Sequence, residues 1–105
     1  MQPAVFRMRI RPGMEEVYRA RHQAVWPEVE AALRRAGFSR YSIFAAGTEL
    51  VAYFEAVDPA STLERLAEDP AMQRWWAWMA PVMADEPPDA HDYVRVYQLD
   101  GPGEE

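Results

Sequence analysis

Two short segments of the sequence hold most of the side chains that could do chemistry. In YRARHQAVWPE, residues 18–28, His22 follows Tyr18 by four positions, and in QRWWAWM, residues 73–79, three of the chain's four tryptophans fall within four positions. Histidine gives or takes a proton near neutral pH, because its reference pKa is about 6.5. A proton-transferring histidine beside flat aromatic rings is typical of a small enzyme that acts on a sugar or another compact ring.

The histidine and its neighbouring tyrosine also have an ordinary structural interpretation. On a helix of about 100° per residue, His22 lies at the margin of the apolar stripe that includes Met14 and Val17. A partly exposed histidine without a role would occupy the same position. Tyr18, one turn earlier, can hydrogen-bond a ligand that contacts His22, or it can be a core tyrosine with its hydroxyl at the rim.

The tryptophans leave a similar choice between core and cavity. The methionines and tryptophans of residues 72–83 recur at helical spacing, which is typical of a buried core stripe. Trp75 and Trp76 nevertheless point about 100° apart, so at least one of them is expected to line a cavity or an interface. Tyr41 lies in the middle of a predicted strand, where its hydroxyl needs a partner if it is buried.

Length and composition limit the remaining possibilities. A chain of 105 residues with half of them hydrophobic predicts one globular domain, residues 1–100, followed by a loose polar tail at 101–105. The net charge is −6 and all 11 basic residues are arginines scattered among acids, which argues against a nucleic-acid surface.

Cysteine is absent, which excludes disulfides and thiolate nucleophiles and favours a reducing cytoplasm. No window approaches the roughly 20 apolar residues of a membrane span, so no membrane is predicted as a partner.

The hydrophobic period predicts four strands and two helical regions, each of them divided in two near a proline. Pro27 breaks the first helical region near Trp26, and Gly37 closes it. Gly47 marks the turn between the second and third strands. The predicted strands are residues 5–10, 38–45, 49–57 and 93–99, and the predicted helical segments are 14–26, 27–36, 61–67 and 71–83.

This order predicts an α+β fold of the ferredoxin-like βαββαβ type, an antiparallel sheet with helices on one face. In residues 49–57 both faces carry apolar side chains, with Leu50 and Phe54 on one side and Val51 and Tyr53 on the other. A second sheet packed on the uncovered face would bury it, so the sequence predicts a homodimer.

His91 stands between Asp89 and Asp92 in an acidic, proline-rich segment. Its neighbours could suggest a metal site, but the spacing is crowded and no second ligand cluster supports one. We therefore expect a solvated loop residue and no metal.

Together these segments resemble the L-rhamnose mutarotase family over residues 5–99. The resemblance is densest in YRARHQAVWPEVEAALRRAG from Tyr18, in RYSIF from Arg40 and in QRWWAWM from Gln73. It implies a dimeric ferredoxin-like fold, a cytoplasmic location, and an isomerase that interconverts the α and β anomers of L-rhamnose, a monosaccharide, without a cofactor. The family pattern is not followed in residues 84–92.

The resemblance also implies roles for individual residues. His22 matches the family's catalytic proton donor, and its sugar-contacting positions are matched by Tyr18, Tyr41, Trp75 and Trp76. Water and a tyrosine hydroxyl are both open as the group that removes the anomeric proton.

Other functions stay open beside this one. The same dimeric fold hosts cofactor-independent monooxygenases and haem-degrading enzymes, and a non-catalytic sugar-binding module would need similar residues. The sequence is also compatible with a related sugar such as L-fucose or L-lyxose.

Overall fold

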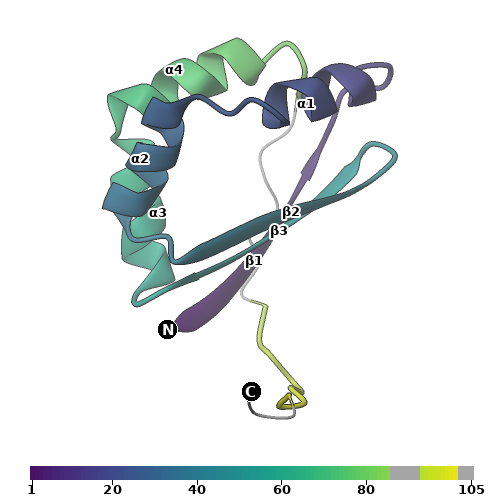
Figure 1. Ribbon diagram of the computed structural model, residues 1–105. Helices are drawn as coiled ribbons and strands as arrows, with labels where there is room; N and C mark the ends of the chain where they lie inside the picture. The colour runs from purple at the N-terminus through teal and green to yellow at the C-terminus, as the bar shows by residue number, and fades with distance from the viewer. Residues whose placement is uncertain (86–92, 102–105) are drawn as a thin grey trace.

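The computed structural model describes residues 1–85 and 93–101. Three strands form one antiparallel sheet in the order β1-β3-β2, and the helices gather on one face of that sheet (Figure 1). This arrangement confirms the predicted α+β fold. The elements are β1 (Gln2–Arg9), α1 (Glu15–His22), α2 (Pro27–Ala36), β2 (Arg40–Ala46), β3 (Glu49–Ala56), α3 (Pro59–Ala67) and α4 (Pro70–Met79).

The strand register explains which side chains reach the core. Phe6 of β1 lies opposite Ala52, and Tyr41 of β2 lies opposite Phe54. Successive residues of a strand point to opposite faces, so these residues share the helix-covered face with Leu50. The buried side chains of β3 lie on this face, as the sequence period predicts.

The predicted break before Pro27 is confirmed, although α1 ends at His22, four residues earlier than expected. Pro27 occupies the first turn of α2, and Trp26 before it has extended backbone angles. Gly37 ends α2 with a φ of 114°, and a Cβ at this position would also lie 2.8 Å from the hydroxyl oxygen of Thr62. Glycine is therefore needed there both for its left-handed backbone and for the close approach of α3.

Two side-chain contacts hold α2 against the other helices. The Arg65 guanidinium donates to the backbone carbonyl of Ala36 at 2.8 and 3.2 Å. Arg35 pairs with Asp69 at 2.8 Å, and the Asp69 carboxylate also caps the start of α4 by accepting from the Ala71 N–H. These contacts fix the position of α2 relative to α3 and α4.

The helix predicted to run to residue 83 is shorter than expected, since α4 ends at Met79. The reason is a backbone pairing between two distant segments, which the periodicity of the sequence does not predict. Met83 forms an isolated antiparallel bridge with Ile10, and the flanking N–H groups of Arg11 and Ala84 donate to the carbonyls of Val82 and Arg9. The chain must leave the helix to make these hydrogen bonds.

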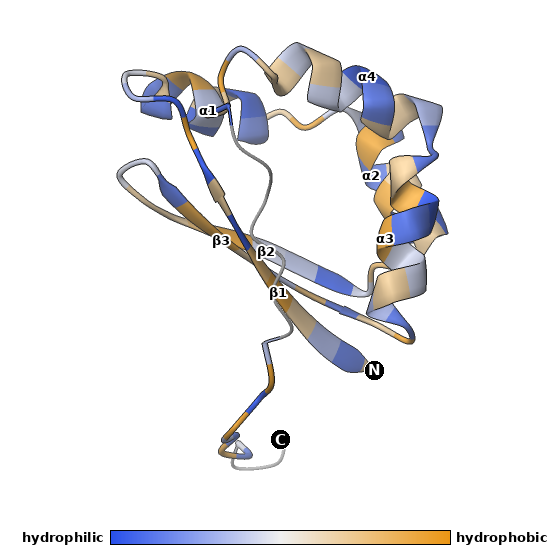
Figure 2. Ribbon diagram, turned by 180° about the vertical axis from the view of Figure 1, so that it is seen from behind, coloured by the Kyte–Doolittle hydropathy of each residue, from blue (hydrophilic) through white to orange (hydrophobic). Residues whose placement is uncertain are grey.

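The last predicted strand, residues 93–99, is not a strand in this chain. A strand needs a partner for its backbone groups, and in the described part of the chain none pairs with this segment. The segment extends away from the helices and carries hydrophobic residues along its length (Figure 2), with Val96 94% exposed. The Arg95 guanidinium donates to the Tyr53 hydroxyl at 3.1 Å, on the helix-free side of the sheet.

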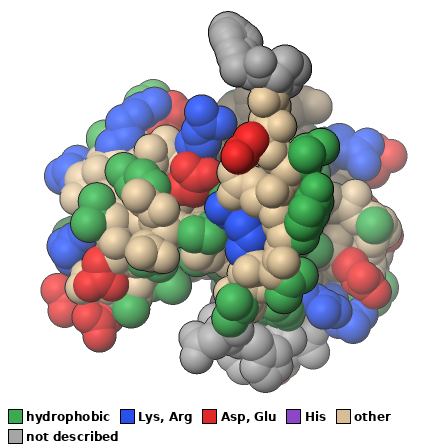
Figure 3. All heavy atoms as spheres, turned by 90° about the horizontal axis from the view of Figure 1, so that it is seen from below, with side chains coloured by type: hydrophobic (Ala, Val, Ile, Leu, Met, Phe, Trp, Pro, Cys, Tyr) green, Lys and Arg blue, Asp and Glu red, His purple; other side chains and the backbone are tan. Residues whose placement is uncertain are grey.

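We use the name helix-free face for the side of the sheet that carries Val5, Arg7, Phe44, Val51 and Tyr53. Phe44 is 63% exposed and Val51 is 40% exposed. Seen from below in Figure 3, the molecule shows hydrophobic side chains among arginine and acidic ones. No helix in the described part of the chain is long and apolar enough to cross a membrane.

Candidate active site

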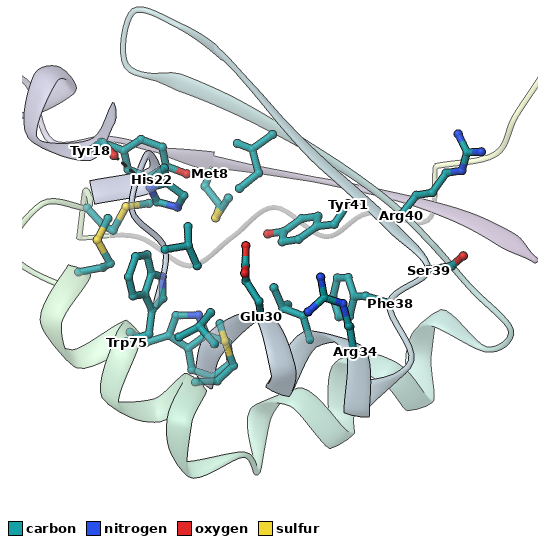
Figure 4. Close-up of a pocket in the computed structure, with 18 residues that line it drawn as sticks. Met8, Tyr18, His22, Glu30, Arg34, Phe38, Ser39, Arg40, Tyr41 and Trp75 are labelled. Atoms are coloured by element: carbon teal, nitrogen blue, oxygen red, sulfur yellow. Dashed lines mark hydrogen bonds between the residues drawn. The ribbon is translucent and has the colours of Figure 1, made fainter. Parts of the chain in front are cut away.

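A cavity of about 520 Å³ lies between the helices and the helix-covered face of the sheet (Figure 4). Its volume falls within the range of roughly 300–1,000 Å³ that is usual for small-molecule sites. All five residues that the sequence singled out line this cavity, although they come from α1, β2 and α4: Tyr18, His22, Tyr41, Trp75 and Trp76.

His22 is the last residue of α1 and is half-buried, as its margin position predicts. Its Nδ1 lies 3.0 Å from the backbone carbonyl oxygen of Tyr18. Because a carbonyl only accepts, Nδ1 carries the hydrogen, and Nε2 is the nitrogen left to exchange a proton with a ligand. Burial lowers the pKa of His22, and the hydrogen bond to the Tyr18 carbonyl opposes that change.

The ring of Tyr18 supports the imidazole from one side. The two rings are stacked with their centroids 4.0 Å apart, and Tyr18 is buried. Burial raises the pKa of the Tyr18 hydroxyl to about 12. Near neutral pH this hydroxyl is therefore protonated and can donate a hydrogen bond.

Tyr41 reaches the cavity from β2 on the opposite side. Its ring packs against Phe38 with the centroids 5.0 Å apart, and its hydroxyl points into the cavity (Figure 4). Burial of that hydroxyl, with a smaller contribution from Tyr18, raises the pKa of Tyr41. Although 36% of the whole residue is exposed, the hydroxyl is the part that enters the cavity.

The two adjacent tryptophans of α4 are in different environments, as their angular separation predicts. Trp75 is only 5% exposed, and its ring meets the His22 ring edge to face with the centroids 5.4 Å apart. Trp76 is 43% exposed and still lines the cavity. Trp75 thus belongs to the core and to the cavity wall, whereas Trp76 belongs to the cavity wall and is open to solvent.

A second aromatic group fixes the end of α1 next to α4. Trp26 packs against Trp75 and Trp78 with centroid distances of 5.0 and 5.1 Å. The Arg21 guanidinium lies 3.7 Å from the centre of the Trp78 ring and donates to the Trp78 carbonyl at 2.7 Å. These contacts place His22, the residue after Arg21, beside Trp75.

Sequence reasoning missed the charged residues of the cavity. Glu30 and Arg34 of α2 both line it, and the Glu30 carboxylate stands near its centre, whereas Arg40 points away (Figure 4). On a helix of about 100° per residue, Glu28 and Glu30 lie at opposite margins of the apolar stripe through Val29. Their positions are equivalent by period, and only the packing of α2 determines which one enters the cavity.

His91, with Asp89 and Asp92, lies outside the described residues. Among the residues that the structure does describe, no group of three or more histidine, aspartate and glutamate side chains could hold a metal ion. The functional groups in the cavity are a half-buried imidazole, two tyrosine hydroxyls, a carboxylate and indole faces. Such a set can transfer protons and bind the hydroxyls and apolar faces of a small ring.

The chain that forms this cavity is similar to proteins of one known family. The model of the L-rhamnose mutarotase family matches residues 4–99. An L-rhamnose mutarotase of Sinorhizobium fredii is 43% identical over 104 residues, which cover 94% of this chain and 99% of that protein. One of Listeria monocytogenes is 40% identical over 97 residues, covering 88% and 92%.

Solved structures give the same picture of the fold. The L-rhamnose mutarotase of Formosa agariphila aligns with a TM-score of 0.77 and 26% identity, over 93% of this chain and all of that one. An antibiotic biosynthesis monooxygenase aligns with a TM-score of 0.62 but only 15% identity, over 90% of this chain and all of that one. The second similarity concerns the fold alone.

Proposed function

This chain belongs to the L-rhamnose mutarotase family, and on that basis we propose that it interconverts the α and β anomers of L-rhamnose. Its relatives carry that activity in their names and match nearly the whole chain. We also propose that residues 1–100 form one catalytic domain; residues 102–105 of the predicted tail lie outside the described residues.

The observation that carries the proposal is the setting of His22. Its Nδ1 is committed to the Tyr18 carbonyl, so a single nitrogen, Nε2, is available to a ligand in the cavity. Burial lowers the pKa of His22, so the imidazolium form is a stronger acid than free histidine. A stronger acid transfers its proton more readily to a sugar oxygen, and the neutral form left behind can take the proton back.

Mutarotation needs only such proton transfers. The bond between C1 and the ring oxygen breaks, its electron pair goes to the ring oxygen, and that oxygen takes a proton from Nε2 of His22. The anomeric hydroxyl loses its proton, and the freed pair forms the carbonyl of the open-chain aldehyde. Rotation about C1–C2 turns the other carbonyl face to the ring oxygen, and the reverse transfers close the ring. No electrons are lost or gained, so the reaction requires no redox cofactor.

The other four residues would hold the sugar during this rotation. The protonated hydroxyls of Tyr18 and Tyr41 can donate to sugar hydroxyls from two sides of the cavity. Indole faces at Trp75 and Trp76 can cover the apolar face and the 6-methyl group of a deoxy sugar. Holding the open chain in a confined cavity favours reclosure over escape.

We also propose that the protein is a homodimer built on the helix-free face. Phe44 and Val51 leave large apolar groups exposed on that face, and residues 93–99 expose a run of alternating side chains without a strand partner in the described chain. A second copy could cover the face and pair with the segment. A cysteine-free chain suits a reducing compartment, which supports the cytoplasm as its location.

Proton NMR with L-rhamnose at anomeric equilibrium tests the proposed activity. Saturating one anomeric signal should reduce the other in proportion to the amount of protein added, because the protein exchanges the two anomers. L-fucose and L-lyxose in parallel samples show whether the exchange extends to related sugars. Saturable rhamnose binding without added exchange would instead make the protein a sugar-binding module and contradict the proposal.

A further inference from the structure

Glu30 is an acidic residue of the cavity wall that is exposed in the single chain. Of the described residues that line the cavity, it alone carries a carboxylate, and that carboxylate stands near the centre, facing Tyr41 (Figure 4). Within the described chain it makes no hydrogen bond and no ion pair. Glu28, two residues earlier, instead points away from the cavity and pairs with Arg74 at 3.2 Å.

The position of Glu30 is nevertheless firmly set. It lies in the first turn of α2, which starts at Pro27 and is held at its other end by Gly37 and the Arg65 guanidinium. Val29, its neighbour, is buried in the core. A carboxylate on a well-anchored helix, with its oxygens unpaired and facing the cavity, lies where a ligand in the cavity can contact it.

The proposed reaction includes one proton transfer to which no residue has yet been assigned. Two protons move during ring opening, one to the ring oxygen and one from the anomeric hydroxyl, and His22 has only one free nitrogen. The tyrosine hydroxyls are poor acceptors, because burial raises the pKa of both Tyr18 and Tyr41 and keeps them protonated. A carboxylate accepts a proton readily and donates it back when the ring closes.

We propose that Glu30 is the second catalytic residue of this site, the base that removes the proton of the anomeric hydroxyl. This inference rests on the proposed mutarotase function. On opening, the imidazolium form of His22 gives its Nε2 proton to the ring oxygen while a Glu30 carboxylate oxygen takes the anomeric proton, which leaves an open-chain aldehyde, neutral His22 and protonated Glu30. Closure on the other carbonyl face returns both protons, so the protein ends in its starting state.

Arg34 lies one turn after Glu30 on the same helix and also lines the cavity. The proposed proton transfers assign it no role. The catalytic pair is His22 from α1 and Glu30 from α2, on opposite sides of the break at Trp26.

The variant Glu30→Gln tests this role, since glutamine keeps the shape and polarity of the side chain but cannot take the proton. The rate constant for anomer exchange at saturating L-rhamnose should fall about 100-fold or more, with the rhamnose dissociation constant changed only a few-fold. The matched control is Glu28→Gln, which removes a glutamate from the same helix outside the cavity and should exchange anomers like the parent.

A second variant separates proton transfer from side-chain shape. In Glu30→Ala, added formate should restore part of the lost rate and do so saturably, because the truncated side chain leaves room for a small carboxylate. Formate should have no such effect on Glu30→Gln. Circular dichroism and the unfolding temperature establish that each variant is folded.

The outcomes separate this inference from the function on which it rests. A folded Glu30→Gln that exchanges anomers at the parent rate, or that only binds rhamnose more weakly, would show that Glu30 is not the base while the mutarotase function stands. Lack of formate rescue in folded Glu30→Ala would also count against the role. A parent protein that does not accelerate exchange would overturn both proposals.

Discussion

The imidazole of His22 stacks on the ring of Tyr18 at a centroid distance of 4.0 Å, and its Nδ1 lies 3.0 Å from the carbonyl oxygen of that same residue. One residue, a single helical turn earlier, thus sets the orientation, the tautomer and much of the burial of the histidine. Only the backbone and ring of Tyr18 do this. In the described structure its hydroxyl makes no hydrogen bond and remains available to a ligand.

Replacing Tyr18 with phenylalanine should therefore weaken sugar binding without disturbing His22. The ring stack and the carbonyl remain, so the fold and the pKa of His22 should change little. Loss of one hydrogen bond, worth about 0.5–1.5 kcal/mol, should weaken rhamnose binding roughly 2- to 12-fold. Calorimetric titration measures the dissociation constant. Unchanged affinity in Tyr18→Phe would mean that this hydroxyl does not contact the sugar.

The lowered pKa of His22 predicts a pH effect on stability. In the unfolded chain the pKa of this histidine returns to about 6.5. At acidic pH a larger fraction of His22 is therefore protonated in the unfolded state than in the folded state. The contribution of His22 to the free energy of unfolding should fall as the pH drops through about 6.5, and it should become independent of pH about one unit above that value.

Urea unfolding of the parent and of His22→Gln at about pH 7.5 and about pH 5 tests this effect. The comparison between the two proteins cancels the titration of all the carboxylates. The parent should lose more stability than the variant on acidification. An equal or smaller loss in the parent would contradict a lowered pKa.

The two tryptophans should respond differently to truncation. Trp75→Ala removes a side chain that is 5% exposed and should cost about 3–5 kcal/mol of stability. Trp76→Ala should cost less, since Trp76 is 43% exposed, yet it should weaken rhamnose binding and reduce the change in tryptophan fluorescence on binding. If Trp76→Ala binds rhamnose like the parent, Trp76 is not part of the sugar site.

The helix-free face predicts the assembly state. Light scattering over a dilution series should give twice the chain mass, and Phe44→Glu should shift the protein towards the monomer by placing a charge where an apolar side chain is buried between copies. Arg19→Glu, on exposed α1 surface, is the matched control and should stay dimeric. A parent protein that is monomeric and folded would rule out this interface.

Local patterns were sufficient to predict much of the fold. Pro27 and Gly37 delimit α2 through their own backbone preferences, and the period of two in β3 assigns its faces. Pairings between segments that are distant in the sequence were not predictable from such patterns. α4 stops at Met79 because Met83 pairs with Ile10, more than 70 residues away in sequence, and residues 93–99 have a strand pattern without a strand partner in the described chain.

In the candidate site, too, local contacts were predictable from the sequence and tertiary contacts were not. His22 and Tyr18 lie one helical turn apart, so their proximity follows from local structure, whereas their contact with Trp75 depends on how α1 packs against α4. Glu30 could not be told from Glu28 in the sequence, because the two glutamates lie at equal angular distances from Val29, on opposite margins of the apolar stripe. Only the tertiary placement of α2 gives one of them a cavity and the other a surface ion pair.

The most direct test of the proposed mechanism is the rate of anomer exchange in His22→Ala, measured by NMR saturation transfer with L-rhamnose beside the parent. The variant should remain folded, because His22 is half-buried at a helix end and alanine has a good helix propensity. His91→Ala serves as the control with the chain's other histidine and should match the parent. We expect exchange in His22→Ala to be about 100-fold slower or more; exchange at the parent rate would contradict the assignment of His22 as the proton donor.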